Sequence, residues 1–281
     1  MGLIYSAAIW GSTFFIVKIC LKDINPVILV AYRFLLASML LALFLILNKK
    51  NIFKDIKKGF FLGVFLWVLY IPQTIGLIYT TSSNSAFITG LFVVFLPLFV
   101  FIFYRRFPSI LKTIAVIISI IGLWFLTGGL REINRGDLMT LITAMAYAAH
   151  ILFVDKFMKD DADPYILSFQ QFFFVGILSV ITGVIFKLPF NVSSTLAIWI
   201  VLFLALFPTL SAFVIQLVAQ KFTSPIKVSL IFALEPVFAA IFSWTLGNEE
   251  FFITRAFGGL LIFIAIVLSE LPANKRISEI I

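Results

Sequence analysis

Long apolar runs alternate with short polar segments along the whole chain. A helix needs about 20 mostly apolar residues to cross a bilayer, and runs of this length recur throughout. The separators carry charges, prolines or small polar residues, as in KDINP, TTSSN and KDDADP. The pattern predicts ten transmembrane helices, at residues 3–20, 27–47, 59–79, 85–104, 111–129, 137–157, 165–187, 197–219, 225–246 and 252–271.

Composition supports an all-α membrane protein. Of the 281 residues, 62% are hydrophobic and 12% are charged, and a soluble domain of this size cannot bury so much apolar surface. The net charge of +8 does not indicate a nucleic-acid partner, because the basic residues lie in short patches between the apolar runs. Cys20 is the one cysteine, which excludes a disulfide framework. The expected partners are the lipid bilayer and a small-molecule substrate.

The Lys and Arg residues predict the orientation. With the N-terminus in the cytoplasm, 14 of the 21 fall on the cytoplasmic side and six on the outer side, while Arg33 lies inside a span. Cytoplasmic loops carry an excess of Lys and Arg. We therefore expect a multi-pass protein of the cell (inner) membrane with both termini in the cytoplasm.

The chain contains an internal repeat. Shifted by 138 residues, the segment 3–34 meets 141–172 with ten identities, including Lys18 with Lys156 and Pro26 with Pro164. A shift of 143 residues aligns Gln73 with Gln216. Because five spans is an odd number, the two units must enter the membrane in opposite directions, a construction typical of secondary transporters. We predict two inverted five-helix repeats around a central cavity, at 1–130 and 136–271, followed by a cytoplasmic tail at 272–281.

Several segments resemble the EamA family of the drug/metabolite transporter superfamily. They are WGSTFFIVK at 10–18, the Pro26 to Arg33 segment, QTIGLIYTTSSNSAFITGL at 73–91, AAHILFVDKF at 148–157 and SLIFALEPVFAAIFSW at 229–244. The resemblance covers nearly the whole chain as two EamA repeats. It implies ten helices, a central cavity, alternating access, and export or exchange of small metabolites, often amino acids. One departure is that no acid in the first repeat matches Glu235.

Polar and aromatic side chains recur at helical spacing inside the spans, which indicates faces directed away from lipid. Trp67, Tyr70 and Gln73 fall within about 120° of one helix surface, given about 100° per residue. A second stripe includes Tyr147 and His150. The residues that we predict to line the substrate cavity are Trp10, Ser12, Trp67, Tyr70, Gln73, Tyr147, His150, Gln216 and Glu235. Thr13, next to Ser12 on the first span, is a further candidate.

Three ionisable residues leave alternatives open. Glu235 lies near mid-bilayer, where an acid costs about 2.5–3.5 kcal/mol. It either contributes to a substrate or ion site, or is protonated and bonds backbone freed by the following proline. His150 is the only histidine; it lines the cavity, bonds a neighbouring helix or responds to protons, and alone it cannot form a metal site. Arg33 either binds an anion, such as a substrate carboxylate, or forms a structural pair or snorkels outward.

Three classes of function fit a membrane protein of this kind. An intramembrane enzyme acting on lipid needs a nucleophile–base pair, an acid dyad or a metal cluster, and the chain has no HExxH and no GxSxG. A channel needs a ring of repeated polar groups. The sequence favours a secondary carrier with no catalytic residues, metal or cofactor. Amino-acid-like or aromatic compounds suit the cavity better than phosphorylated or nucleotide-linked sugars, since no cation lies at mid-depth. Proton coupling, and a monomer against a homodimer, stay open.

Overall fold

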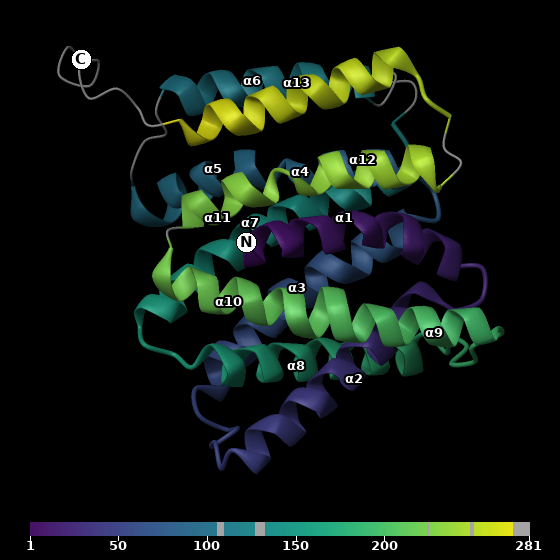
Figure 1. Cartoon of the computed structure of the whole chain (residues 1–281), viewed down its shortest axis with the longest axis vertical. Coiled ribbons are helices and arrows are strands. Elements are labelled where there is room, and N and C mark those ends of the chain that lie inside the picture. The colour runs from purple at the N-terminus through teal and green to yellow at the C-terminus, as the bar shows by residue number, and fades with distance from the viewer. Residues whose placement is uncertain (106–109, 127–132, 224, 248–249, 272–281) are drawn as a thin grey trace.

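The computed structural model describes residues 1–105, 110–126, 133–223, 225–247 and 250–271, and the regular structure within them is helical (Figure 1). The first repeat contains α1 (Gly2–Cys20), α2 (Pro26–Leu47), α3 (Ile56–Gly76), α4 (Ser82–Gly90), α5 (Phe92–Tyr104) and α6 (Ile110–Leu126). The second contains α7 (Arg135–Lys159), α8 (Pro164–Ile185), α9 (Thr195–Leu204), the π-helix η1 (Ala205–Ser211), α10 (Ala212–Phe222), α11 (Pro225–Phe232), α12 (Glu235–Thr245) and α13 (Ile253–Glu270).

The all-helical prediction is confirmed, and each predicted span coincides with helix. Seven helices of the described residues are long and apolar enough to cross a membrane; α6 and α13 contain shorter apolar stretches. Two spans predicted as continuous, 85–104 and 225–246, are broken near their middles, between α4 and α5 and between α11 and α12. The predicted tail at 272–281, and the end of the span at 111–129, lie outside the described residues.

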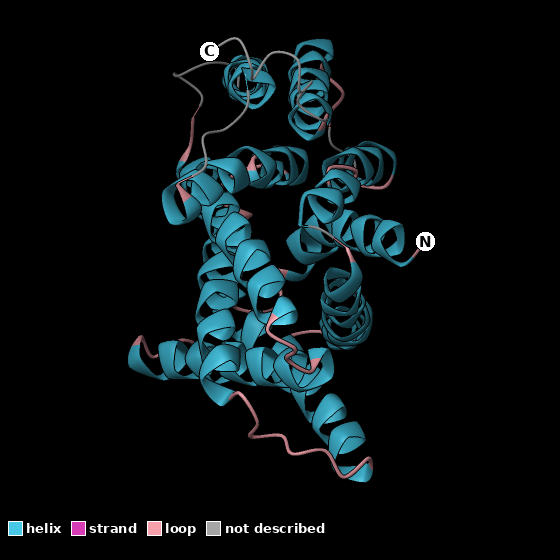
Figure 2. Ribbon diagram, turned by 90° about the vertical axis from the view of Figure 1, so that its left-hand side faces the viewer, coloured by secondary structure: helices cyan, strands magenta, loops and turns pink. Residues whose placement is uncertain are grey.

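We divide the helices around the centre of the molecule into two groups. The first group consists of α1, α2, α9, η1, α10, α11 and α12; the second consists of α3, α4, α5, α7 and α8. Within the first group α1 packs on α12 and α10, and within the second α3 packs on α7 and α8. The boundary between the groups is itself densely packed: α2 contacts α8 more extensively than any helix of its own group, α4 packs on α12 and α1 as well as on α7, and α10 also contacts α7 and α8. Helices α6 and α13 pack on each other as an outer layer at one edge of the molecule (Figures 1 and 2).

The same two sequence signals, a capping Asn or Asp followed by a proline, mark the N-termini of α2 and α8. Asn25 accepts a hydrogen bond from the N–H of Val27 at 3.0 Å, and Pro26 occupies the first turn. Asp163 accepts from Tyr165 at 2.9 Å and precedes a proline in the same way. Proline suits this position because its missing N–H has no partner within the helix. Burial works against ionisation of Asp163, but bonds from Lys50 and from the backbone N–H groups hold its pKa below the ordinary value.

The polar segment TTSSN forms a buried junction between three helices. Thr81 caps α4 by accepting from the N–H of Asn84 at 3.1 Å. Thr80 donates to Asp137 at 2.5 Å, and Asp137 belongs to the capping box of α7. The hydroxyl of Ser82 donates to the carbonyl of Phe14 on α1 at 3.3 Å. The segment therefore links α1, α4 and α7 directly after the end of α3. We call this end of the bundle, where α3 and α4 form a helical hairpin, the hairpin end.

The π-helix η1 follows from Pro208. A proline inside a helix cannot bond the carbonyl four residues earlier, which here is that of Leu204. The hydroxyl of Thr209 donates to this carbonyl at 2.7 Å instead. The carbonyl of Pro208 accepts the indole N–H of Trp10 at 2.7 Å. The irregular turn thus fixes the position of a central aromatic side chain.

Candidate functional site

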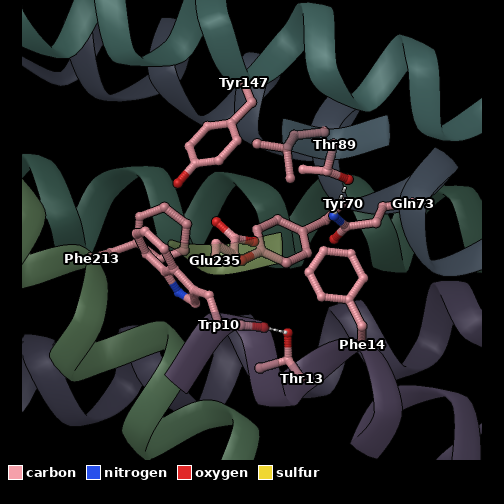
Figure 3. A pocket seen from close by; sticks show the side chains of 10 residues that line it. Trp10, Thr13, Phe14, Tyr70, Gln73, Thr89, Tyr147, Phe213 and Glu235 are labelled. Carbon is pink, nitrogen blue, oxygen red and sulfur yellow. Dashed lines mark hydrogen bonds between the residues drawn. The ribbon is translucent and has the colours of Figure 1, made fainter. Parts of the chain in front are cut away.

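A central cavity lies between the two helix groups (Figure 3). Its volume is about 20 Å³. The lining residues are Trp10, Thr13, Phe14, Leu69, Tyr70, Gln73, Thr89, Tyr147, Phe213 and Glu235. A volume of 20 Å³ suffices for one or two water-sized groups, since one needs roughly 10–15 Å³. A larger ligand requires the cavity to widen.

Each helix group supplies one wall of the cavity. Helices α1, α10 and α12 of the first group face α3, α4 and α7 of the second across it. At the hairpin end, Lys18 of α1 donates to the carbonyl of Thr80 at 2.5 Å. At the opposite end, Gln220 of α10 donates to the carbonyl of Ile151 at 3.1 Å, and Lys221 pairs with Asp161 at 3.2 Å. Contacts between the two groups therefore bridge both ends of the cavity.

Aromatic rings form much of the wall. The ring of Trp10 lies 4.9 Å from Phe213, 4.9 Å from Phe232 and 6.2 Å from Tyr147, between ring centroids. The Tyr70 ring lies 6.1 Å from Phe213. These tilted and edge-to-face contacts are the arrangements that aromatic pairs favour. They present an apolar surface suited to stacking.

The polar groups of the cavity are few and lie apart. At one side, the amide of Gln73 donates to the hydroxyl of Thr89 at 3.2 Å. At the other, the carboxylate of Glu235 and the hydroxyl of Tyr147 point toward a common space beside Phe213 (Figure 3). Oε2 of Glu235 and the hydroxyl oxygen of Tyr147 are buried, and neither has a hydrogen-bond partner among the described residues. Unpaired buried polar atoms are rare in folded proteins and indicate a ligand, a proton or a strained site.

The structure brings five of the nine predicted cavity residues together and places four elsewhere. Trp10, Tyr70, Gln73, Tyr147 and Glu235 line the cavity. Ser12 bonds the carbonyl of Ile9 within its own helix at 2.7 Å. Trp67 is partly buried and packs against the apolar core. His150 shares a 2.8 Å hydrogen bond with Gln171 of α8, and Gln216 donates to Gln220 at 2.9 Å. The His150 bond joins α7 to α8, whereas the Gln216 bond lies within α10, and neither residue is among those that line the cavity.

The further candidate Thr13 also lines the cavity, and four lining residues were not among those predicted: Phe14, Leu69, Thr89 and Phe213. The repeat offers a signal for Phe213, because the 143-residue shift that aligns the two glutamines also aligns Phe213 with Tyr70. Thr13 lies about one helical turn after Trp10, on the same face, whereas Ser12 lies roughly 160° away from that face. Leu69, Phe14 and Thr89 carry no signal in an apolar sequence. Their position follows from packing alone.

Arg33 is buried directly behind the cavity wall. Its Nε donates to the hydroxyl of Thr209 at 2.9 Å, and its guanidinium lies 4.7 Å from the ring centroid of Tyr70 and 5.2 Å from that of Phe34. Among the described residues it forms no ion pair. The planar guanidinium is therefore held by a hydroxyl and two aromatic faces. Its tie to η1 places it in the packing of α2, separated from the cavity by Tyr70.

We expect Thr209→Val to destabilise the protein by about 1–3 kcal/mol, the cost of leaving buried polar groups unpaired. The change removes the acceptor of Arg33 and the donor to Leu204 together. The measurement is thermal unfolding of the detergent-purified protein. Thr182→Val is the matched control, because that hydroxyl only bonds the carbonyl of Leu178 in its own helix. Equal losses in the two variants would contradict the role of Thr209.

The architecture defines a class: a multi-pass helical membrane protein with a central cavity enclosed between two helix groups. The chain belongs to the EamA-like transporter family, whose pattern matches residues 1–128 and 134–271. It is 33% identical to an uncharacterized transporter of Archaeoglobus fulgidus over 271 residues, covering 96% of this chain and 85% of the relative. It is 21% identical to the uncharacterized transporter YoaV of Bacillus subtilis, covering 98% of each.

A solved crystal structure matches the fold with a TM-score of 0.73 at 14% identity, covering 98% of this chain and 97% of that one. The resemblance to the EamA family is confirmed. The protein is a membrane transporter, and its family and relatives indicate a transporter rather than an enzyme.

Proposed function

We propose that the protein is a secondary transporter that exports or exchanges small amphipathic metabolites, amino acids or similar aromatic compounds, by alternating access. The observation that carries this proposal is the position of the cavity. It lies between two helix groups, and contacts between the groups bridge both of its ends. The cavity can open at one end at a time if the two helix groups tilt relative to each other.

The packing supports two inverted five-span repeats. In the repeat, α1 corresponds to α7, and the span of α11 and α12 corresponds to that of α4 and α5. The packing of α1 on α12 therefore has its counterpart in the packing of α7 on α4 and α5. Likewise, α3 corresponds to the span that contains η1, and α8 corresponds to α2. The packing of α3 on α8 has its counterpart in the packing of η1 on α2. The helix breaks at Leu91 and Leu234 are also separated by 143 residues, the shift that aligns Gln73 with Gln216. Both groups contain helices of both repeats, so the moving bodies are mixed groups of helices.

The cavity supports the substrate class. Its aromatic walls and few polar groups suit a compound with one apolar part and one or two polar groups. No Lys or Arg is among the described residues that line it, whereas a site for a phosphorylated sugar would need several cations. We place ten spans in the cell membrane with both termini in the cytoplasm, as the distribution of Lys and Arg favours.

Uptake by proteoliposomes tests the proposal. We expect one class of solute to accumulate from a pooled set of labelled amino acids and small metabolites, offered with and without a pH gradient. Gln73→Leu should reduce its initial rate by about tenfold, the effect of one lost hydrogen bond of about 1.4 kcal/mol. Gln216→Leu is the matched control, because its amide joins Gln220 outside the cavity.

The control variant should retain uptake and lower the unfolding temperature. Absence of uptake under every condition, with folded protein recovered, would overturn the carrier assignment for these compounds. Normal uptake by Gln73→Leu would instead remove Gln73 from the substrate path.

A further inference from the structure

We propose that the cavity recognises a substrate through its ammonium group, and that the carboxylate of Glu235 binds this group. This inference rests on the proposed function, since it names the chemical feature that the carrier reads. It makes amines and zwitterionic amino acids ligands of the cavity, and excludes carboxylic acids and alcohols of the same size.

The first observation is the isolation of Glu235. The side chain is 5% exposed, begins α12 and lines the cavity, and Oε2 has no hydrogen-bond partner among the described residues. Among the described residues, no hydrogen bond joins this side chain to the backbone beside Pro236. Glu235 also forms none of the ion pairs of the described residues. A buried carboxylate is costly unless it is paired or neutralised, which makes the site ready to accept a positive group.

The second observation is the aromatic wall around this carboxylate. Trp10, Tyr147 and Phe213 line the cavity beside Glu235 (Figure 3). The indole of Trp10 is held in place by the carbonyl of Pro208. Aromatic faces attract a cation within about 6 Å of the ring centroid, and this is how proteins recognise ammonium ligands. The unpartnered hydroxyl oxygen of Tyr147 adds an acceptor for an ammonium N–H.

The chemistry of the site favours an organic cation over a metal ion. Glu235 is the one carboxylate among the described lining residues, and no group of three or more His, Cys, Asp and Glu side chains among the described residues could hold a metal. Calcium takes six to eight oxygen ligands, which this wall does not supply. The accessible space, about 20 Å³, matches one ammonium-sized group.

The side of the cavity formed by Gln73 and Thr89 suits a carboxylate or carbonyl group of the substrate. The Gln73 amide bonds Thr89 through one contact, and an amide nitrogen has a second N–H. That N–H can donate to a carboxylate or carbonyl of the ligand. The ring of Tyr70 separates the guanidinium of Arg33 from the cavity. We place the substrate ammonium between Glu235 and the wall formed by Trp10, Tyr147 and Phe213.

The test compares three probes that share a phenylethyl skeleton: 2-phenylethylamine, 2-phenylethanol and 3-phenylpropionate. Binding to the detergent-purified full chain is measured by ligand-dependent thermal stabilisation, which rises with ligand concentration over Kd. We expect the amine to bind at least about tenfold more tightly than the alcohol and the acid. Glu235→Gln should reduce the preference for the amine over the alcohol to about twofold or less. Glu250→Gln, which changes an exposed acid outside the cavity, should leave the preference unchanged.

Equal binding of amine and alcohol by the unmodified protein would overturn the inference, as would binding of none of the probes. A preference that persists in Glu235→Gln, while the variant unfolds cooperatively, would also overturn it. Binding of the acid alone would overturn it and transfer recognition to Arg33. Because binding is read without transport, a carrier that moves labelled metabolites yet shows no amine preference would refute this inference and leave the proposed function standing.

Discussion

Crosslinking residues 18 and 80 should abolish transport, and reduction of the crosslink should restore it. Lys18 of the first helix group donates to the carbonyl of Thr80 of the second at 2.5 Å, at the hairpin end. If alternating access opens the cavity at this end, the two residues must separate in every cycle. A covalent link between them holds the end closed. Cys20 is buried, so Cys20→Ser gives a background without native thiols.

The experiment uses Lys18→Cys with Thr80→Cys, joined by a short bis-methanethiosulfonate reagent and released by dithiothreitol. Uptake by proteoliposomes is measured before linking, after linking and after release, with the linked fraction read by gel shift. The matched control shares one cysteine: Thr80→Cys with Asp137→Cys, whose native side-chain oxygens lie 2.5 Å apart within the second group. Linking this control pair should leave uptake intact. Normal uptake by a fully linked 18–80 pair would contradict separation of the groups at this end.

The control also decides which helices move together. The repeats suggest that the first and second halves of the sequence move as bodies, and residues 18 and 80 both belong to the first half. The division into two helix groups places these residues on opposite sides of the cavity, and it places Thr80 and Asp137, from different halves, on the same side. Loss of uptake with the 80–137 link and not with the 18–80 link would favour movement of the sequence halves.

Much of the fold could be predicted because span length and the caps are local signals. Asn25–Pro26 and Asp163–Pro164 begin helices where the sequence indicates. The break between α11 and α12 lies two residues before Pro236 and has a local signal, but the break between α4 and α5 could not be placed in this way. Pro97 lies inside α5, and the chain breaks earlier, at Leu91, where no proline occurs. Next to this break α4 packs on α7 and α12, and these contacts between distant segments are not visible in the local sequence.

The candidate site shows the same limit. Gln73 and Gln216 align in the repeat and have the same chemistry, yet one lines the cavity and the other bonds Gln220. The two repeats share a backbone plan, but their side chains meet different neighbours. Periodicity identifies which helix face carries polar groups. It does not distinguish a face that meets the cavity from one that meets another helix.

Gly11→Ala should disrupt both stability and transport, because no side chain fits where α1 crosses α12. A Cβ at residue 11 would lie 2.7 Å from Cβ of Phe238, 2.8 Å from the carbonyl oxygen of Glu235 and 2.9 Å from the backbone nitrogen of Ala239. Two of these atoms belong to the backbone of α12, so the helices must move apart. Forcing extra atoms into a packed interior costs about 1–3 kcal/mol.

The same displacement separates Trp10 from Glu235, which lie on opposite sides of this crossing and face one cavity. We therefore expect a lower unfolding temperature in detergent together with loss of uptake. Gly2→Ala is the control on the same helix: its Cβ would meet only Cγ2 of Ile215, at 2.8 Å, the end of a side chain that can rotate away. Phe238→Ala added to Gly11→Ala should not restore either property, since the backbone contacts remain. Full rescue by that second change would show that the Phe238 side chain, and not the approach of the two backbones, limits residue 11.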